Sequence, residues 1–225
     1  MADGNQISAS DLTTARHYSN TLFNIMRGGI FACDYKVDIN DVREFIGNWN
    51  LALLNKHKSF FKKIKETLDY QDLLNATREL GDPDLTRIIL EYLPITFSRR
   101  HGDPSRPWNQ FSIDVKNDDG GQKLYYQGNW RDIFQNWEAL AISYPDFIES
   151  FITKFVNAST LDGYNPYRIT KDGIDWEILD PEDPWSNIGY WGDHQIVYLL
   201  RLLELSIKYH RQGIEDCDVK AYNEA

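Results

Sequence analysis

The sequence predicts an all-α protein made of antiparallel helical hairpins, with one small β-hairpin. Apolar residues recur at the spacing of one helix face along most of the 225-residue chain. Residues that cap or interrupt helices stand between these stretches, and a strand-like alternation flanks a turn in one place. Hydrophobic residues make up 42% of the chain, which is enough for a core. We expect one domain over residues 1–225, with a frayed polar tail at residues 212–225.

The first half of the chain contains four stretches with helical periodicity. Asp38 or Asn40 can cap the first one. Its apolar residues are Val42, Phe45, Ile46 and Trp49. The next three run over residues 53–68, over residues 69–80 with Gly81 as the stop, and from Pro83 to Pro94. Proline suits the first turn of a helix and cannot continue one, while glycine accepts the left-handed conformation at a helix end.

The second half begins with the predicted β-hairpin and returns to helices. Phe111–Val115 and Lys123–Gln127 flank a turn at Asn117–Gly121 that contains Asp-Gly. Helices are then expected from Trp130, from Pro145, and from about His194 to His210, after a long loop over residues 159–193. Apolar residues cover most of the circumference of the last helix, so we expect it to be buried on most sides.

The composition excludes several classes of function. A net charge of -10 argues against nucleic acid and against an anionic membrane surface, because both need clustered Lys and Arg. The two cysteines do not form a disulfide framework or a zinc motif, and no metal or organic cofactor is expected. The first residues lack a secretory pattern and no stretch is long enough to span a bilayer, which favours a cytoplasmic protein.

Three segments combine charged, amide and aromatic residues in loops or at helix starts. They are Phe97–Asn109, Tyr126–Glu138, and the region from Asp162 to His194. Sugar hydroxyls need planar polar partners such as Asp, Arg, Asn and Gln, and the apolar face of a sugar ring needs an aromatic side chain. The second and third segments supply both, which favours a carbohydrate site.

Each of these residues also has a purely structural interpretation. Asp193 can be only the N-cap of the last helix, and Arg131 with Asp132 can be a surface ion pair. Taken singly, Trp130, Trp137 and Trp191 are more typical of a core than of a sugar platform. No phosphate-binding loop, nucleophile elbow or metalloprotease motif is present, and no catalytic residue is identified.

Two short motifs resemble those of the cellobiose and chitobiose phosphorylase family. Trp130–Asn136 is similar to the family's Arg-Asp-x-x-Gln-Asp segment, and Ile188–His194 is similar to its Gly-Phe-Ser-Asp-Asp segment, which precedes a buried helix. The resemblance covers roughly residues 130–209. It implies part of a six-hairpin (α/α) toroid that binds the non-reducing-end sugar of an oligosaccharide, with inorganic phosphate as the possible co-substrate. The resemblance implies that Arg131, Asp132 and Asp193 form hydrogen bonds with this sugar. The predicted substrate-binding residues are these three together with Trp130, Gln135 and Trp191.

The departures from the family pattern bear on activity. Asn136 replaces an Asp, and Gly192 replaces one of two paired aspartates. The family's general-acid segment, a Trp-Asn-Asp-Gly run, is not found. A six-hairpin toroid at about 11–12 residues per helix also needs well over 225 residues. We therefore expect an incomplete domain that exposes apolar sides of its last helix and pairs with a missing remainder or with itself. The alternatives are a non-catalytic helical interaction module and a glycan-binding domain without chemistry.

Overall fold

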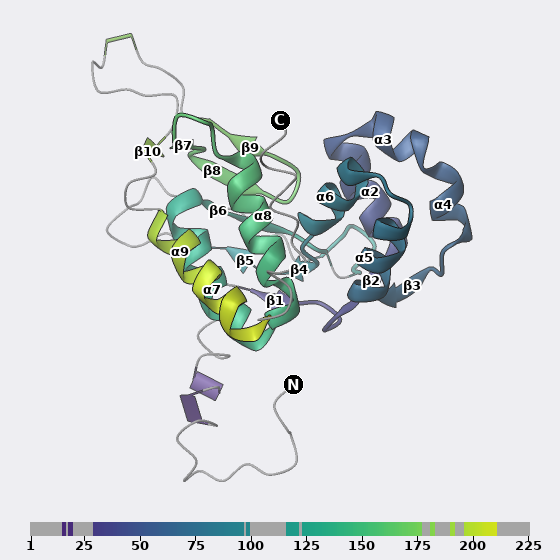
Figure 1. Ribbon diagram of the computed structural model, residues 1–225, viewed down its shortest axis with the longest axis horizontal. Helices are drawn as coiled ribbons and strands as arrows, with labels where there is room; N and C mark the ends of the chain where they lie inside the picture. Colours follow the sequence, from purple (N-terminus) through teal and green to yellow (C-terminus); the bar gives the residue numbers. More distant parts are fainter. Residues whose placement is uncertain are drawn as a thin grey trace.

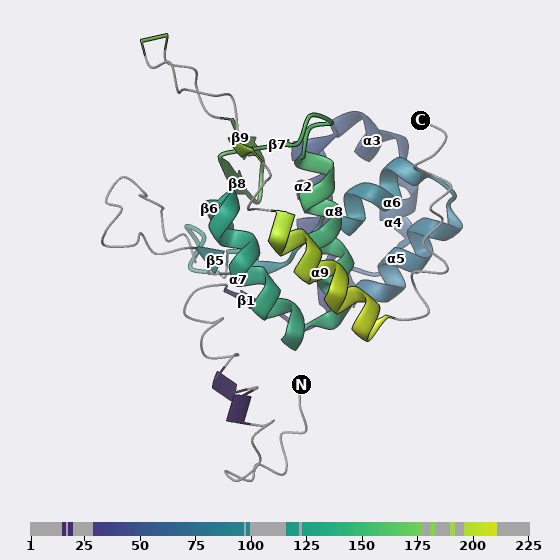
Figure 2. The same ribbon diagram turned by 60° about the vertical axis from the view of Figure 1, so that its left-hand side comes forward.

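The computed structural model describes residues 15–16, 18–19, 29–96, 98–99, 116–121, 123–176, 181–182, 190–191 and 196–210. Figure 1 shows two adjoining regions, with helices α2 to α6 in one and helices α7 to α9 in the other. The same division is visible in the turned view of Figure 2. Both regions contribute to one buried hydrophobic cluster, so they share a single core.

The first region is helical but is closed by short strands. Its helices are α2 (Ile39–Trp49), α3 (Leu51–Lys56), α4 (Lys58–Lys63), α5 (Tyr70–Glu79) and α6 (Pro83–Leu90). Strand β2 (Lys36–Asp38) pairs antiparallel with β3 (Thr67–Asp69). Strand β1 (Ile30–Phe31) pairs antiparallel with β4 (Ile95–Thr96). The second pairing brings the two ends of this region side by side.

Capping side chains set the helix starts in this region, as the sequence indicates. Asp38 begins α2 by accepting a hydrogen bond from the Asn40 amide, and Asp69 begins α5 in the same way through Gln71. Gly81 follows α5 with a φ of +67°, a conformation that glycine adopts without strain. The predicted helix over residues 53–68 is instead divided into α3 and α4, and its end is the strand β3.

The second region packs three helices against a small sheet. The helices are α7 (Trp130–Ser143), α8 (Ile148–Ala158), which follows the 3-10 turn η1 (Pro145–Phe147), and α9 (Ile196–Tyr209). Strands β5 (Ser98–Arg99), β6 (Tyr126–Asn129), β8 (Arg168–Thr170) and β9 (Ile174–Asp175) form one sheet in that order. Strand β7 (Tyr164–Asn165) pairs antiparallel with β10 (Tyr190–Trp191).

Helices α7 and α9 run in the same direction, and α8 runs the opposite way (Figures 1 and 2). The end of α9 lies at the start of α8, where His210 Nδ1 is 2.7 Å from Glu149 Oε1 and the Ser206 hydroxyl donates to the same oxygen. The antiparallel hairpins α7–α8 and α8–α9 are therefore present, and they place the starts of α7 and α9 at one end of the helix layer.

The all-α assignment is wrong, because the described residues form four small sheets in addition to the helices. The strands are two to four residues long and fall mostly in segments that the sequence leaves as loops. The turn at Asn117–Gly121 is confirmed by two backbone hydrogen bonds between Asn117 and residues 120 and 121. Of the predicted hairpin strands, residues 111–115 lie outside the described residues, and β6 pairs with β5 and β8.

The expectation that α9 is buried on most sides is also wrong. Leu202 and Ser206 face the protein, but a row of apolar side chains on α9 is exposed. The exposed residues are Ile196, Val197, Leu200, Leu203, Ile207 and Tyr209. The competing expectation, that the last helix exposes apolar sides, is confirmed. The predicted tail at residues 212–225 lies outside the described residues.

Candidate functional site

The start of α7 is built against the segment that follows α8. In the sheet, Asn129 of β6 pairs with Arg168 of β8, and the Trp130 amide donates to the Tyr167 carbonyl. Gly128 makes this close packing possible, because a Cβ atom there would lie 3.2 Å from Ile133 in the first turn of α7. The first turn of α7 is thereby fixed beside residues 167–168.

The approach to α9 is built against the same segment. The backbone of Trp191 pairs with Tyr164, and that of Tyr190 pairs with Asn165. The side chain of Asn165 is buried and accepts a hydrogen bond from the Ser159 hydroxyl at 2.7 Å, which attaches this strand to the end of α8. Residues 164–170 thus contact both the start of α7 and the strand that precedes α9, so two of the three polar segments are brought together.

The structure describes the predicted site residues to different extents. Asp132 lies in the first turn of α7 and is 4% exposed, and Gln135 lies one turn further and is exposed. Trp191 is placed through its backbone pairing alone, and Arg131 is placed as part of the α7 backbone. Asp193 lies outside the described residues. The convergence of all these side chains in one cleft remains a prediction.

Trp130 occupies the core and does not present a face to solvent. Its ring is fully buried, with centroids 4.7 Å from Phe134 and 5.1 Å from Phe155. Its indole N–H is buried and has no hydrogen-bond acceptor among the described residues. This packing matches the structural interpretation of Trp130, and any contact with a sugar would come through the indole edge.

Two further carboxylates of the polar segments, Asp175 and Glu138, are described by the structure. Asp175 forms an ion pair with Arg168, with Oδ2 2.6 Å from the guanidinium Nε. Glu138 is half-buried on α7, and burial raises its pKa, against the lowering effect of Arg201 and with a smaller raising effect of Glu204. A raised pKa is what a general acid needs near neutral pH. Glu138 lies two turns along α7, beyond the first turn that carries Asp132.

A pocket that sequence reasoning missed lies between the two regions. It has a volume of about 150 Å³ and is lined from α2 and α3, from α6, from α8 and from strands β8 and β9. Its polar lining residues are Asn50, Asp84, Arg87, Glu91, Lys154 and Asn157. Lys154 lies among apolar residues of α8 that include Phe151 and Phe155, which is the one sequence signal that indicates a buried amine.

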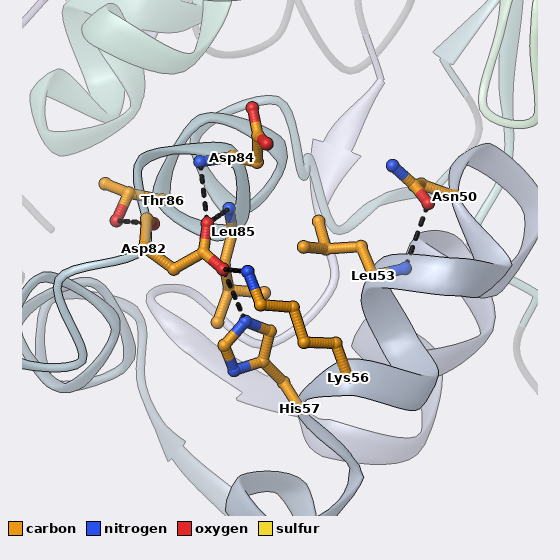
Figure 3. Close-up of polar contacts among 8 residues, drawn as sticks. All are labelled: Asn50, Leu53, Lys56, His57, Asp82, Asp84, Leu85 and Thr86. Carbon is orange, nitrogen blue, oxygen red and sulfur yellow. Dashed lines mark hydrogen bonds and ion pairs between the residues drawn. The ribbon is translucent and has the colours of Figure 1, made fainter.

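Figure 3 shows a second polar cluster, which joins α3 and α4 to the start of α6. Asp82 Oδ2 accepts hydrogen bonds from Lys56 Nζ at 2.6 Å and from His57 Nε2 at 2.7 Å, while Oδ1 accepts from the Asp84 and Leu85 amides. All four hydrogen bonds that the Asp82 carboxylate accepts come from groups of the protein itself. This cluster is therefore a helix cap reinforced by an ion pair, and we assign it a structural role. No group of three or more potential metal-ligating side chains occurs among the described residues.

Residues 31–94 match a family model, that of glycoside hydrolase family 149 insertion domain 1. Over these residues the chain is therefore similar to a domain of a glycoside hydrolase family. The matched family 149 region covers the helices α2 to α6, where the sequence analysis assigned no carbohydrate role. It supports a glycosidase-related protein but does not support the specific resemblance to cellobiose and chitobiose phosphorylases. A comparison with curated proteins found no match.

The structure agrees with the description of the family 149 region as an insertion. Phe31 and Ile95, at its two ends, are paired across β1 and β4. A segment whose ends meet can be inserted between two residues of another domain without separating them. None of the described helices has the length and hydropathy needed to cross a lipid bilayer.

Proposed function

We propose that this chain is the sugar-binding part of a glycoside phosphorylase or hydrolase. The observation that carries the proposal is the packing of residues 164–170 against both the start of α7 and the strand that precedes α9. This packing gathers the two segments that resemble the glycone-binding motifs of glycoside phosphorylases. The match of residues 31–94 to a glycoside hydrolase family supports the same class independently, from a different part of the chain.

In this proposal the start of α7 binds the non-reducing-end sugar of an oligosaccharide. Asp132 accepts hydrogen bonds from sugar hydroxyls, and the Gln135 amide both accepts and donates them. Arg131 and Asp193 complete the polar residues of the site, and Trp191 packs its ring against the apolar face of the sugar. Inorganic phosphate attacks the glycosidic bond in a phosphorylase, and water attacks it in a hydrolase. The general acid is not assigned.

A thermal-shift panel of mono- and disaccharides, each with and without phosphate, tests the proposal. A sugar that binds the folded chain raises the unfolding temperature. Asp132→Asn should weaken binding by about 1–3 kcal/mol, because a charged hydrogen bond to a hydroxyl is replaced by a neutral one. Asp162→Asn, which changes an exposed turn residue, is the matched control and should leave binding unchanged.

If the buried Asp132 proves necessary for folding, Gln135→Ala tests the same site, because Gln135 is exposed and its replacement does not disturb the core. A helical interaction module without a ligand site predicts no stabilisation by any sugar. A glycan-binding domain without chemistry predicts stabilisation with no phosphate consumed and no bond cleaved.

A further inference from the structure

The pocket between the family 149 region and α8 has a buried cation in its wall. Lys154 is 1% exposed, and its Nζ donates one hydrogen bond, to the Glu91 carbonyl at 3.3 Å. An ammonium group has three N–H donors, and a buried charge is costly unless acceptors surround it. Since the pocket is lined by Lys154, oxygen atoms of a bound molecule can accept the remaining hydrogen bonds.

Three aromatic rings hold the Lys154 ammonium beside the pocket. Its Nζ lies 5.3 Å from the ring centroid of Phe45, 5.2 Å from that of Trp49 and 5.5 Å from that of Tyr126. The Tyr126 hydroxyl is also buried and has no hydrogen-bond partner among the described residues. The Lys154 ammonium is therefore held in place at the pocket by rings of α2 and β6, of which Trp49 also lines the pocket.

The charges around the pocket balance. Arg87 and Lys154 are opposed by Asp84 and Glu91, and the amides of Asn50 and Asn157 add neutral donors and acceptors. Of these, Glu91 Oε1 accepts from Asn157 at 2.6 Å, whereas no ion pair is found for Arg87 or Asp84 in the described part of the chain. A balanced site with both donors and acceptors favours a neutral, hydroxyl-rich molecule over a phosphate or a carboxylate.

Apolar residues complete the site. Trp49 is partly buried, and Ile88, Ile169 and Ile174 line the same cavity. A volume of about 150 Å³ is below the range of about 300–1,000 Å³ typical of drug-sized ligands, so one small ring is the largest unit that fits. We infer that this pocket binds a single sugar ring, as a second carbohydrate site separate from the start of α7.

This inference rests on the proposed function for the class of ligand, but none of the residues predicted for the α7 site lines the pocket. The two sites can therefore be tested independently. A terminal hexose of an oligosaccharide would place its hydroxyls against Lys154 and Arg87 and an apolar face against Trp49.

The experiment is an NMR titration of the Trp49 indole N–H, assigned with Trp49→Phe, using glucose, N-acetylglucosamine, cellobiose and inorganic phosphate. At least one sugar should shift this signal saturably, and phosphate should not. Arg87→Ala and Lys154→Met should each weaken the binding by at least about tenfold. Arg78→Ala, which removes an exposed arginine from α5, is the matched control and should have no effect.

Three results would overturn the inference: no sugar shifts the signal, phosphate alone reproduces the shift, or both pocket variants bind as tightly as the unaltered chain. Because Arg87 is exposed, its variant gives an answer even if Lys154→Met fails to fold. Asp132→Asn should leave the Trp49 shift unchanged. If no sugar shifts the Trp49 signal but sugar binding still depends on Asp132, the second site alone is overturned. If a sugar shifts the Trp49 signal but no binding depends on Asp132, the α7 site alone is overturned.

Discussion

At the scale of single residues, Asp82 makes more hydrogen bonds than its role as an N-cap requires. It begins α6 through two backbone amides and also accepts hydrogen bonds from Lys56 and His57, which lie at the junction of α3 and α4 (Figure 3). The hydrogen bonds from Lys56 and then from His57 hold the pKa of Asp82 well below its ordinary value, against the raising effect of burial. The ionised carboxylate therefore contributes to stability.

Asp82→Asn should lower the free energy of unfolding at pH 7, and by a smaller amount at pH 3, where the contribution of the carboxylate has begun to fall. The folded pKa of Asp82 lies below the unfolded one, so its contribution is present above about pH 4 and is lost as the pH falls. Urea titrations at the two pH values measure this difference. Asp69→Asn is the control, because Asp69 caps α5 by the same geometry without an ion pair among the described residues. Equal losses for both variants at pH 7 would contradict the account.

Lys154 is the opposite case to Asp82, because its environment in the folded protein disfavours the charged form of the side chain. Burial lowers the pKa of Lys154 to about 8, although Glu91 and Asp172 raise it. Because the unfolded chain keeps its proton up to about pH 10, the folded state binds fewer protons between pH 8 and pH 10. Folding stability from this group therefore increases with pH over that window.

The unaltered chain should gain stability relative to Lys154→Met between pH 8 and pH 10, by up to about 1.4 kcal/mol per pH unit. Chemical denaturation of both proteins at several pH values gives the difference, and tyrosine ionisation cancels because both proteins contain the same tyrosines. A pH-independent difference would show that Lys154 is not desolvated in the folded state.

At the scale of elements, the sequence predicts helices better than strands. Helices α2, α5, α6 and α7 carry apolar faces over eight to fourteen residues, and their N-cap residues are Asp38, Asp69, Asp82 and Asn129. The strands have two to four residues, which is too short for an alternating pattern to be recognised. Their pairing depends on contacts between residues far apart in the chain, such as Asn129 with Arg168.

Exposure is harder to predict than helix formation. Leu200 and Leu202 are identical residues in the same helix, yet Leu200 is 54% exposed and Leu202 is fully buried. The apolar composition of α9 indicates that several faces can be covered, but it does not show which neighbours are present. The pocket was missed for a related reason, because an isolated lysine in a helix is usually solvent-exposed.

Leu202→Ala should cost about 2–5 kcal/mol of unfolding free energy, because it removes buried methyl groups and leaves a cavity between α9 and its neighbours. Leu200→Ala is the matched control in the same helix and should change stability by no more than about 0.5 kcal/mol. Denaturant unfolding of the two variants provides the comparison. A similar cost for both would mean that the exposed face of α9 is covered in solution, which would agree with the predicted self-association.

At the scale of the whole molecule, the region that matches the family 149 model and a three-helix layer share one core and several polar contacts. Lys171 binds Asp41 through an ion pair, and the Trp49 indole N–H donates to the Lys171 carbonyl. These contacts fix the family 149 region against strands β8 and β9, whose neighbour β6 leads into α7. The matched region and the candidate sugar site are thus joined by direct contacts within one core.

The segments of the candidate site could be predicted from the sequence, but the contacts that bring them together in space could not. The resemblance of Trp130–Asn136 and Ile188–His194 to family motifs predicts sugar binding, whereas the strand pairings that bring their neighbourhoods together have no sequence pattern of their own. The buried position of Trp130 agrees with the structural interpretation of a single tryptophan and not with the sugar contact that the motif implies.

The central claim is that the starts of α7 and α9 together bind a sugar. A crystal structure of the chain with the sugar that stabilises it most tests this claim directly. The account predicts a sugar ring with a hydroxyl within about 3.2 Å of an Asp132 carboxylate oxygen and with Trp191 and Asp193 beside the same ring. A bound sugar found only elsewhere, or an Asp132 carboxylate enclosed by protein with no ligand in reach, would contradict it.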